Sequence, residues 1–203
     1  MGRRGRFGKY GECKRVERLR RPRTDPFVLF RERPSSRAAA GPGWNKELQE
    51  KRIRIRPACP SDVEYIRGLS RRAFSLFGPY EEILTRWFES GVTRSVLALL
   101  GETPAGFIML GPSWSGPYPR SASELLAIAV EPGVRRQGIG DLLVREAEKM
   151  AKALEVSRLV LFTALENSAA RRLFIRHGFV PVEVRKAFYP RGQDAMMMER
   201  EIP

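Results

Sequence analysis

A short run of glycine and arginine residues offers the clearest chemistry in this 203-residue sequence. The segment Val130–Gly140 reads VEPGVRRQGIG, so an apolar strand is expected to end, a tight turn to follow, and a helix to begin at Gly138 and Gly140. Glycine lets a ligand approach the backbone closely, and the N–H groups at a helix start attract anions. Arg135 and Arg136 add positive charge beside them. The segment is therefore predicted to bind a phosphate or a pyrophosphate.

Two common phosphate-binding motifs are excluded at this position. A P-loop requires Gly-Lys-Ser/Thr, but Asp141 follows Gly140 here. The dinucleotide-binding fingerprint requires a third glycine at the position that Leu143 occupies. Taken alone, Gly138-x-Gly140 is also compatible with a helix start that packs tightly on a strand.

A second motif lies downstream, in a predicted helix that follows a predicted strand. Its spaced residues are Asn167, Ala170, Leu173, Phe174, Gly178 and Phe179. This pattern resembles the second motif of the GNAT N-acetyltransferase superfamily, and Arg135-x-x-Gly138-x-Gly140 resembles the acyl-CoA pyrophosphate loop of the same superfamily. The resemblance covers about Ile53 to Ile202 and is strongest from Glu124 to Phe179.

The resemblance implies a fold and a co-substrate. The fold is an α/β domain, with a mixed twisted sheet of about six or seven strands flanked by about four helices. The implied co-substrate is acetyl-CoA, in a gap between the parallel strands Leu125–Val130 and Leu159–Thr163, and no metal is implied. The implied binding residues are Ile128, Ala129, Val130 and Asn167 for the pantetheine arm, and Arg135, Arg136, Gln137, Gly138, Ile139 and Gly140 for the pyrophosphate.

Hydrophobic periodicity predicts the elements that position these residues. Predicted strands cover Ile53–Arg56, Ser95–Leu100, Ala105–Leu110, Glu124–Val130, Arg158–Thr163, Val180–Val184 and Ala195–Ile202. One helix is expected to open at a capping box, Ser61-Asp62-Val63-Glu64. Further helices are expected around Ile83–Phe88, from Gly138 to Leu154 and from Ser168 to His177. The order β-α-α-β-β-β-α-β-α-β-β independently favours an α/β domain around a mixed sheet.

Proton transfer requires a base, for which Glu124 is the first candidate. It precedes Val130 by six residues, which matches the catalytic glutamate of histone-type GNAT enzymes. The resemblance implies that Glu124 removes a proton from the amine through an ordered water. An ordinary glutamate at the start of a strand is the alternative interpretation.

Tyr189 is the second catalytic candidate. The segment Arg185–Pro190 resembles the C-terminal loop of protein N-terminal acetyltransferases, including the ribosomal-protein alanine type, where that loop lines the peptide N-terminus. By this resemblance, Tyr189 holds the acceptor backbone or relays a proton. Alternatively, it is a hairpin aromatic side chain that covers the sheet.

The sequence departs from the family pattern at two positions. Phe174 stands where many members have a tyrosine that protonates the thiolate, and Phe162 stands where the ribosomal type has a glutamate. A thiol has a pKa of about 8.5, so the thiolate can leave without a protein acid. An α-amine, with a pKa of about 8 against about 10.4 for lysine, needs less help from a base. The absence of these two proton-transferring side chains thus favours an α-amine acceptor.

Acceptor specificity is expected to come from the region Phe74–Glu89 and the loop Ser113–Arg120. Several aromatic side chains there could form a slot, and Glu81 and Glu82 could attract a cationic amine; the aromatic residues are Phe74, Phe77, Tyr80, Trp114 and Tyr118. His177, the single histidine of the chain, is interpreted as a packed side chain at a helix end.

Charge divides the chain near residue 52. Residues 1–52 hold 16 Lys/Arg and 6 Asp/Glu, against 21 and 17 in residues 53–203. The first segment has too few large apolar residues to offset its chain entropy, so we expect a disordered basic extension before a domain at 53–203. This extension could contact RNA or a ribosome, or it could be a solvated tail.

Other features exclude whole classes of protein. No apolar run approaches the roughly 18 residues of a membrane span, and no apolar segment of a secretory signal follows the basic start. Cys13 and Cys59 lie far apart and form no metal motif, which suggests a reducing cytoplasm.

Together these features predict an N-acetyltransferase that uses acetyl-CoA, with a protein N-terminus as the favoured acceptor. A small-molecule amine acetyltransferase is one alternative. A catalytically weak acyl-CoA-binding module, tethered by its basic tail, is another.

Overall fold

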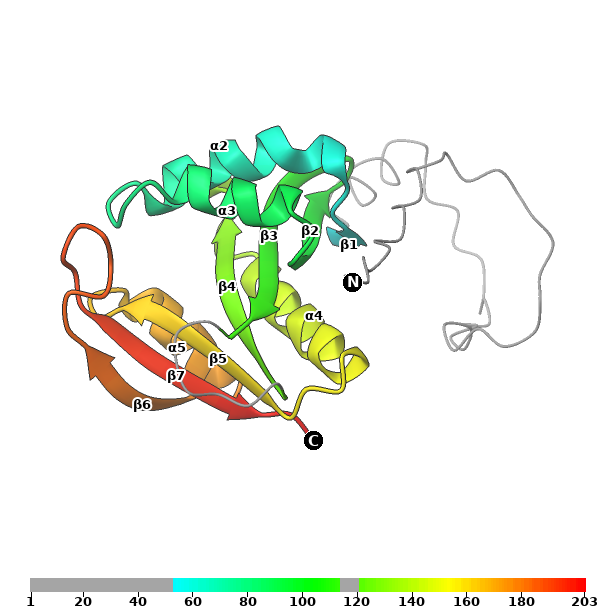
Figure 1. The fold of residues 1–203 in the computed structure, drawn as a ribbon. Coiled ribbons are helices and arrows are strands. Elements are labelled where there is room, and N and C mark those ends of the chain that lie inside the picture. Colours follow the sequence, from blue (N-terminus) through cyan, green and yellow to red (C-terminus); the bar gives the residue numbers. More distant parts are fainter. Residues whose placement is uncertain (1–52, 114–120) are drawn as a thin grey trace, which may run out of the picture. The chain divides into compact units, whose positions relative to one another are not determined.

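The computed structural model describes residues 53–113 and 121–203 (Figure 1). The predicted disorder of residues 1–52, and the predicted roles of Trp114 and Tyr118, lie outside these ranges. No helix within them is long and apolar enough to cross a membrane.

Seven strands form one mixed sheet in the order β1-β2-β3-β4-β5-β7-β6. All neighbouring pairs are antiparallel except β4 and β5, which run parallel. The predicted α/β fold and the predicted order of elements are confirmed. The strands are β1 Ile53–Pro57, β2 Arg94–Leu100, β3 Thr103–Pro112, β4 Ala122–Val130, β5 Arg158–Ala164, β6 Val180–Arg185 and β7 Ala195–Glu201.

In the part of the chain that the structure describes, four α-helices flank the sheet, and two short 3₁₀ turns precede two of them. The helices are α2 Val63–Phe74, α3 Tyr80–Glu89, α4 Ile139–Ala153 and α5 Ser168–Arg176, and the turns are η1 Pro60–Asp62 and η2 Pro132–Val134. The capping box predicted at Ser61 and Glu64 is wrong. Asp62 instead accepts a 2.8 Å hydrogen bond from the backbone N–H of Cys59, because the chain already turns at Pro60.

Alternating strand residues build a core on each side of the sheet. In β2, Val96 and Ala98 belong to the cluster that packs against α4, whereas Leu97 and Leu99 belong to the cluster formed with α2 and α3. This alternation follows from the two-residue period of a strand. Figure 1 shows α2 and α3 on one side of the sheet and α4 on the other.

A β-bulge in β4 opens the sheet next to β5. Leu110 pairs with Leu125 and Met109 with Ala127, so Leu126 is an extra residue in β4. Gly111 accommodates its side chain, because a Cβ there would lie 2.6 Å from Leu126 Cδ1. Pairing between β4 and β5 runs from Ala122 to Leu125 and stops at the bulge. A bulge bends its strand, and Figure 1 shows β4 and β5 diverging beyond this point.

Candidate active site

The divergence of β4 and β5 opens into a pocket. Residues 125–128 of β4 line one side and residues 161–164 of β5 line the other. Helices α2 and α3, the start of α5 and the β6–β7 loop supply the remaining walls. The predicted cofactor residues Ile128, Ala129 and Val130 lie on β4 beyond the last residue that pairs with β5. Buried backbone groups require partners, so an extended ligand with amide groups fits this gap.

The predicted pyrophosphate loop adopts an anion-binding geometry. Arg136 and Gly138 both have left-handed backbones, with φ of 65° and 82°. Such a loop before a helix turns successive N–H groups toward one point. A Cβ at Gly138 would meet no atom within 4 Å, so the space over the loop is open. Arg135, Arg136 and Gln137 are exposed, and the Nε of Arg135 donates to the carbonyl of Val130 at 3.2 Å.

The start of α4 packs closely against α5. A Cβ at Gly140 would lie 3.3 Å from Leu173 Cδ2, so this second glycine permits close helix packing. Ile139 is 1% exposed and belongs to the core, so only its backbone can face a ligand. Asn167 caps α5 by accepting a 3.1 Å hydrogen bond from the N–H of Ala170. This cap uses only the amide oxygen, which leaves the amide N–H groups for a ligand in the adjoining pocket.

Glu124 brings a carboxylate to the pocket. It is 7% exposed, lies inside β4 beside Val160 of β5, and lines the cavity. Burial, together with the charge of Glu124, raises the pKa of Tyr80 to about 12. The acid predicted as the base therefore lies close to a phenol on α3.

Tyr189 lines the same pocket from the β6–β7 loop. Burial, and to a lesser extent the proximity of Tyr80, raises the pKa of Tyr189 above its usual value. The two rings are 6.1 Å apart between centroids. Because both pKa values are raised, Tyr80 and Tyr189 are neutral phenols at physiological pH. Both phenols can therefore donate hydrogen bonds into the pocket.

Aromatic rings form much of the pocket wall. Phe162 stacks on Phe188, with centroids 4.5 Å apart and ring planes 16° apart. The guanidinium of Arg185 lies 4.9 Å from the centroid of Phe162, a cation–π distance. The rings of Tyr189 and Phe77 pack against each other, with centroids 4.9 Å apart. Residues from β5, the β6–β7 loop and the α2–α3 region therefore meet around one apolar space.

Two loops meet over this space. The side chain of Gln193 and the backbone N–H of Arg191 donate to the carbonyls of Leu76 and Phe77, respectively. Pro190 fits against Gly78, where a Cβ would lie 2.9 Å from the proline ring. These contacts fix the β6–β7 loop to the α2–α3 loop.

An ion pair shapes the β6–β7 loop internally. Asp194 binds Lys186 at 2.7 Å and accepts a 3.0 Å hydrogen bond from the N–H of Ala187. These partners hold the pKa of the Asp194 carboxyl below its usual range. The loop therefore presents Tyr189 in a fixed position.

Two further aromatic residues, Phe174 and Trp87, belong to the pocket lining. Phe174 was expected in the core, and it is 2% exposed and packs edge-on against Phe179. Trp87 of α3 also lines the pocket, although no sequence signal marked it as a pocket residue. Within the described ranges, no group of three or more His, Cys, Asp or Glu residues is placed to hold a metal ion.

Comparisons with known proteins agree with this geometry. The profile of the acetyltransferase (GNAT) family matches residues 63–179. An N-alpha-acetyltransferase of Sulfurisphaera tokodaii is 30% identical over 155 residues, covering 73% of this chain and 92% of that protein.

Two solved structures share the fold. The ribosomal-protein-S18-alanine N-acetyltransferase from Escherichia coli has a TM-score of 0.62 at 23% identity, covering 74% of this chain and 94% of that one. The protein yncA from Salmonella typhimurium, solved with its cofactor acetyl-CoA, has a TM-score of 0.65 at 18% identity, again covering 74% and 94%.

Proposed function

The chain belongs to the GNAT acetyltransferase family, and we propose that it transfers the acetyl group of acetyl-CoA to the α-amine of a protein or peptide. One observation carries the choice of acceptor: among the described residues that line the pocket, Glu124 is the one carboxylate, and the rest of the lining, next to the β4–β5 divergence, is mainly apolar and aromatic. The name of the Sulfurisphaera relative supports the same acceptor class.

The donor side fits acetyl-CoA. The left-handed Gly138 and the open space above it suit a pyrophosphate. Ile128, Ala129 and Val130 offer backbone groups to the pantetheine amides, and Asn167 offers its amide N–H groups. When bound, acetyl-CoA supplies the thioester carbonyl that the amine attacks. The protein holds this donor mainly through its backbone.

We assign proton removal to Glu124. A protonated α-amine entering the pocket meets one carboxylate, and an ordered water between them can carry the proton. The α-amine has a pKa of about 8, so a single carboxylate acting through water is sufficient near neutral pH.

Tyr189 acts as a neutral hydrogen-bond donor in this proposal. Its raised pKa keeps the proton on the phenol, so it can bind a backbone carbonyl of the acceptor. Phe174 cannot donate a proton, and none is required from it, because a thiolate whose conjugate acid has a pKa of about 8.5 leaves readily.

The acceptor walls favour a chain terminus. The two joined loops place Phe77 and Tyr189 over the pocket. An apolar first residue can pack against the stacked Phe162 and Phe188, while its amine points toward Glu124. A polyamine would bring several charges against these apolar walls, and burying unpaired charges is costly.

The test is thiol release from acetyl-CoA with three matched acceptor sets. These are short peptides with varied first residues and no lysine, N-terminally blocked peptides with one lysine, and polyamines. We expect turnover with the first set, and loss of that turnover in Glu124→Gln. Turnover with polyamines alone would show a small-molecule enzyme. Acetyl-CoA binding without turnover would show a binding module.

The basic segment 1–52 belongs to the proposal as a separate anchor for RNA or the ribosome, in the cytoplasm. Its 16 basic and 6 acidic residues suit a polyanion. A shortened chain that begins at Lys51 should keep its kinetics with peptides and lose salt-sensitive RNA binding. Equal RNA retention by both chains would contradict this role.

A further inference from the structure

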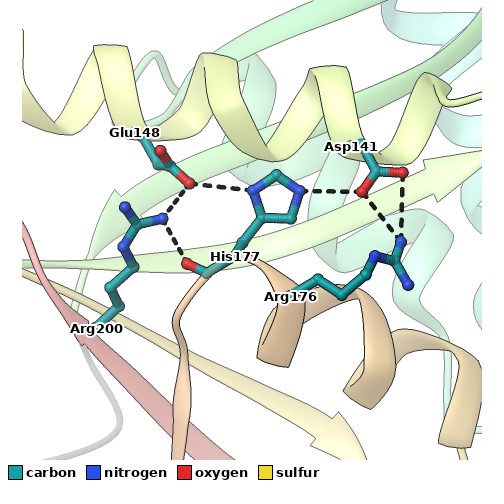
Figure 2. A network of polar contacts seen from close by, with 5 residues as sticks. All are labelled: Asp141, Glu148, Arg176, His177 and Arg200. Atoms are coloured by element: carbon teal, nitrogen blue, oxygen red, sulfur yellow. Dashed lines mark hydrogen bonds and ion pairs between the residues drawn. The ribbon is translucent and has the colours of Figure 1, made fainter.

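A five-residue ion network lies next to the start of α4 (Figure 2). The ring of His177 sits between two carboxylates of that helix. Its Nε2 lies 3.1 Å from Asp141 Oδ1, and its Nδ1 lies 3.3 Å from Glu148 Oε1. The His177 side chain is only 10% exposed. Asp141 and Glu148 are seven residues apart, which places them on one face of α4.

The geometry selects the charged form of the histidine. An ionised carboxylate only accepts hydrogen bonds, and a neutral imidazole has a single N–H to donate. Burial works against the charge of Asp141, but its bonds to Arg176 and His177 prevail and lower its pKa, so it is ionised at neutral pH. Only an imidazolium at His177 can donate to both carboxylates.

Three further cations face this histidine from the surrounding elements. Arg176 of α5 binds Asp141 at 3.0 and 3.3 Å. Arg200 of β7 binds Glu148 and the backbone carbonyl of His177. Arg145 of α4 lines the same depression. The five residues of Figure 2 carry one net positive charge with an imidazolium and none with a neutral imidazole.

The network adjoins the proposed donor site. Asp141 directly follows Gly140 in the first turn of α4, whose N–H groups we assign to the pyrophosphate. An unpaired carboxylate in that turn would repel the ligand, although it suits the helix dipole. His177 and Arg176 hold Asp141 toward the end of α5, as Figure 2 shows.

We propose that His177 is a positioning residue for donor binding. As an imidazolium it ties α4 to the end of α5, neutralises Asp141, and so strengthens the binding of the acetyl-CoA pyrophosphate. Loss of its proton weakens that binding. The proposal rests on the proposed use of acetyl-CoA. Because an imidazolium loses its charge when the pH is raised far enough, donor affinity should fall as the pH rises.

The test measures donor affinity by calorimetry at about pH 6 and pH 8, in the wild type and in His177→Gln. The ligand is acetyl-dephospho-CoA, which keeps the pyrophosphate but lacks the 3′-phosphate that titrates in the same range. One charge beside the pyrophosphate predicts a wild-type Kd about threefold higher at pH 8 than at pH 6. The Kd of His177→Gln should change with pH less than the Kd of the wild type does.

Asp141→Asn provides the second variant. Without the carboxylate at position 141, His177→Gln should change the Kd less than it does in the wild type, and this non-additivity would show that the two residues act together. A measurement on the unaltered protein covers the case in which a variant fails to fold. Calorimetry in two buffers of different ionisation enthalpy should show net proton uptake when the donor binds near pH 7.

The outcomes separate this proposal from the proposed function. A pH dependence equal in wild type and His177→Gln, or binding without proton uptake, would overturn the role of His177 while leaving the proposed function intact. An absence of donor binding by the wild type at both pH values would overturn both.

Discussion

The proposed donor side, a loop, and the proposed acceptor side, a pocket, are built in opposite ways. The proposed pyrophosphate loop is one contiguous segment, Arg135–Gly140, which works through backbone groups and two glycines. The acceptor side is assembled from aromatic side chains of the α2–α3 region, β5 and the β6–β7 loop. The donor side therefore depends on local backbone conformation, whereas the acceptor side depends on tertiary packing.

This difference has a functional consequence. Backbone groups bind the same ligand whatever the neighbouring side chains are, which suits a donor that is common to a family. Side chains can be exchanged without rebuilding the fold, which suits an acceptor that varies between members. Phe162 and Phe174 stand where the family resemblance implied polar residues, and each packs against a neighbouring aromatic ring.

The largest expected effect concerns Glu124, the carboxylate that lines the pocket. Glu124→Gln should lower kcat for a peptide acceptor about 100-fold or more, because the base is lost. The Kd for acetyl-CoA should stay unchanged, as calorimetry can check. Glu199→Gln is the matched control, since Glu199 lies on β7 and pairs with Arg158 at 3.2 Å, outside the pocket. An unchanged kcat in Glu124→Gln would remove the carboxylate from the mechanism.

The next effect isolates the donor side. Gly138→Ala should raise the Kd for acetyl-CoA about tenfold, because a left-handed backbone costs an L residue about 1–2 kcal/mol. Gly133→Ala is the control, because a Cβ at either glycine meets no atom within 4 Å, but only Gly138 has a positive φ. Similar affinities in both variants would mean that the loop conformation does not contribute to binding.

A smaller effect isolates the acceptor side. Phe162→Leu should raise the KM of the peptide about threefold, because an aromatic pair contributes about 0.5–1.5 kcal/mol beyond its buried area. The Kd for acetyl-CoA should not move. Phe188→Leu should raise the KM of the peptide by a similar factor. The double variant should raise KM by less than the product of the two factors, because each single change already breaks the stack. Additive changes in KM would indicate that the two rings contact the acceptor independently.

The smallest effect on activity is expected at Asp62, whose bonds hold the turn that precedes α2. Asp62 binds Arg56 at 2.6 and 2.7 Å as well as the N–H of Cys59. Asp62→Asn should lower the free energy of unfolding by about 2 kcal/mol with little change in kcat. Glu64→Gln is the control, because its side chain is 73% exposed and pairs only along the helix surface.

The ionisation of Asp62 should make the free energy of unfolding depend on pH. Burial works against its charge, but the bonds from Arg56 and Cys59 prevail and lower the folded-state pKa of Asp62. Its contribution to stability is therefore present above the unfolded pKa of about 3.9 and is lost as pH falls toward the lower folded value. Denaturant unfolding should show the gap between wild type and Asp62→Asn narrowing below about pH 4. A constant gap would contradict the assignment.

The same contrast explains what the sequence could predict. The loop Arg135–Gly140 and the helix that follows carry local signals, glycines and a 3.6-residue period, and both were located correctly. The parallel pairing of β4 and β5 followed from the family resemblance. The bulge at Leu126 could not be predicted, because it is a mismatch of register between β3 and β4. The capping error arose because Ser61 and Glu64 fit the common pattern, whereas Pro60 starts the turn one residue earlier.

The acceptor side needed tertiary information. Phe162 was noticed from sequence only as a missing glutamate, because its stack with Phe188 joins residues 26 positions apart. Tyr80 was expected in an aromatic slot, but its closeness to Glu124 depends on how α3 crosses β4. The sequence held part of the signal for the environment of His177, since Asp141 and Glu148 share one face of a predicted helix. That this face packs against His177, at the end of α5, could not be inferred from the sequence.

The most direct test of the account is to locate the acetyl group on one peptide that carries both a free α-amine and a lysine. The purified protein would be incubated with acetyl-CoA and this peptide, and the product would be sequenced by tandem mass spectrometry. We predict acetylation of the α-amine, which depends on Glu124, with the lysine unmodified. Acetylation of the lysine alone would contradict it.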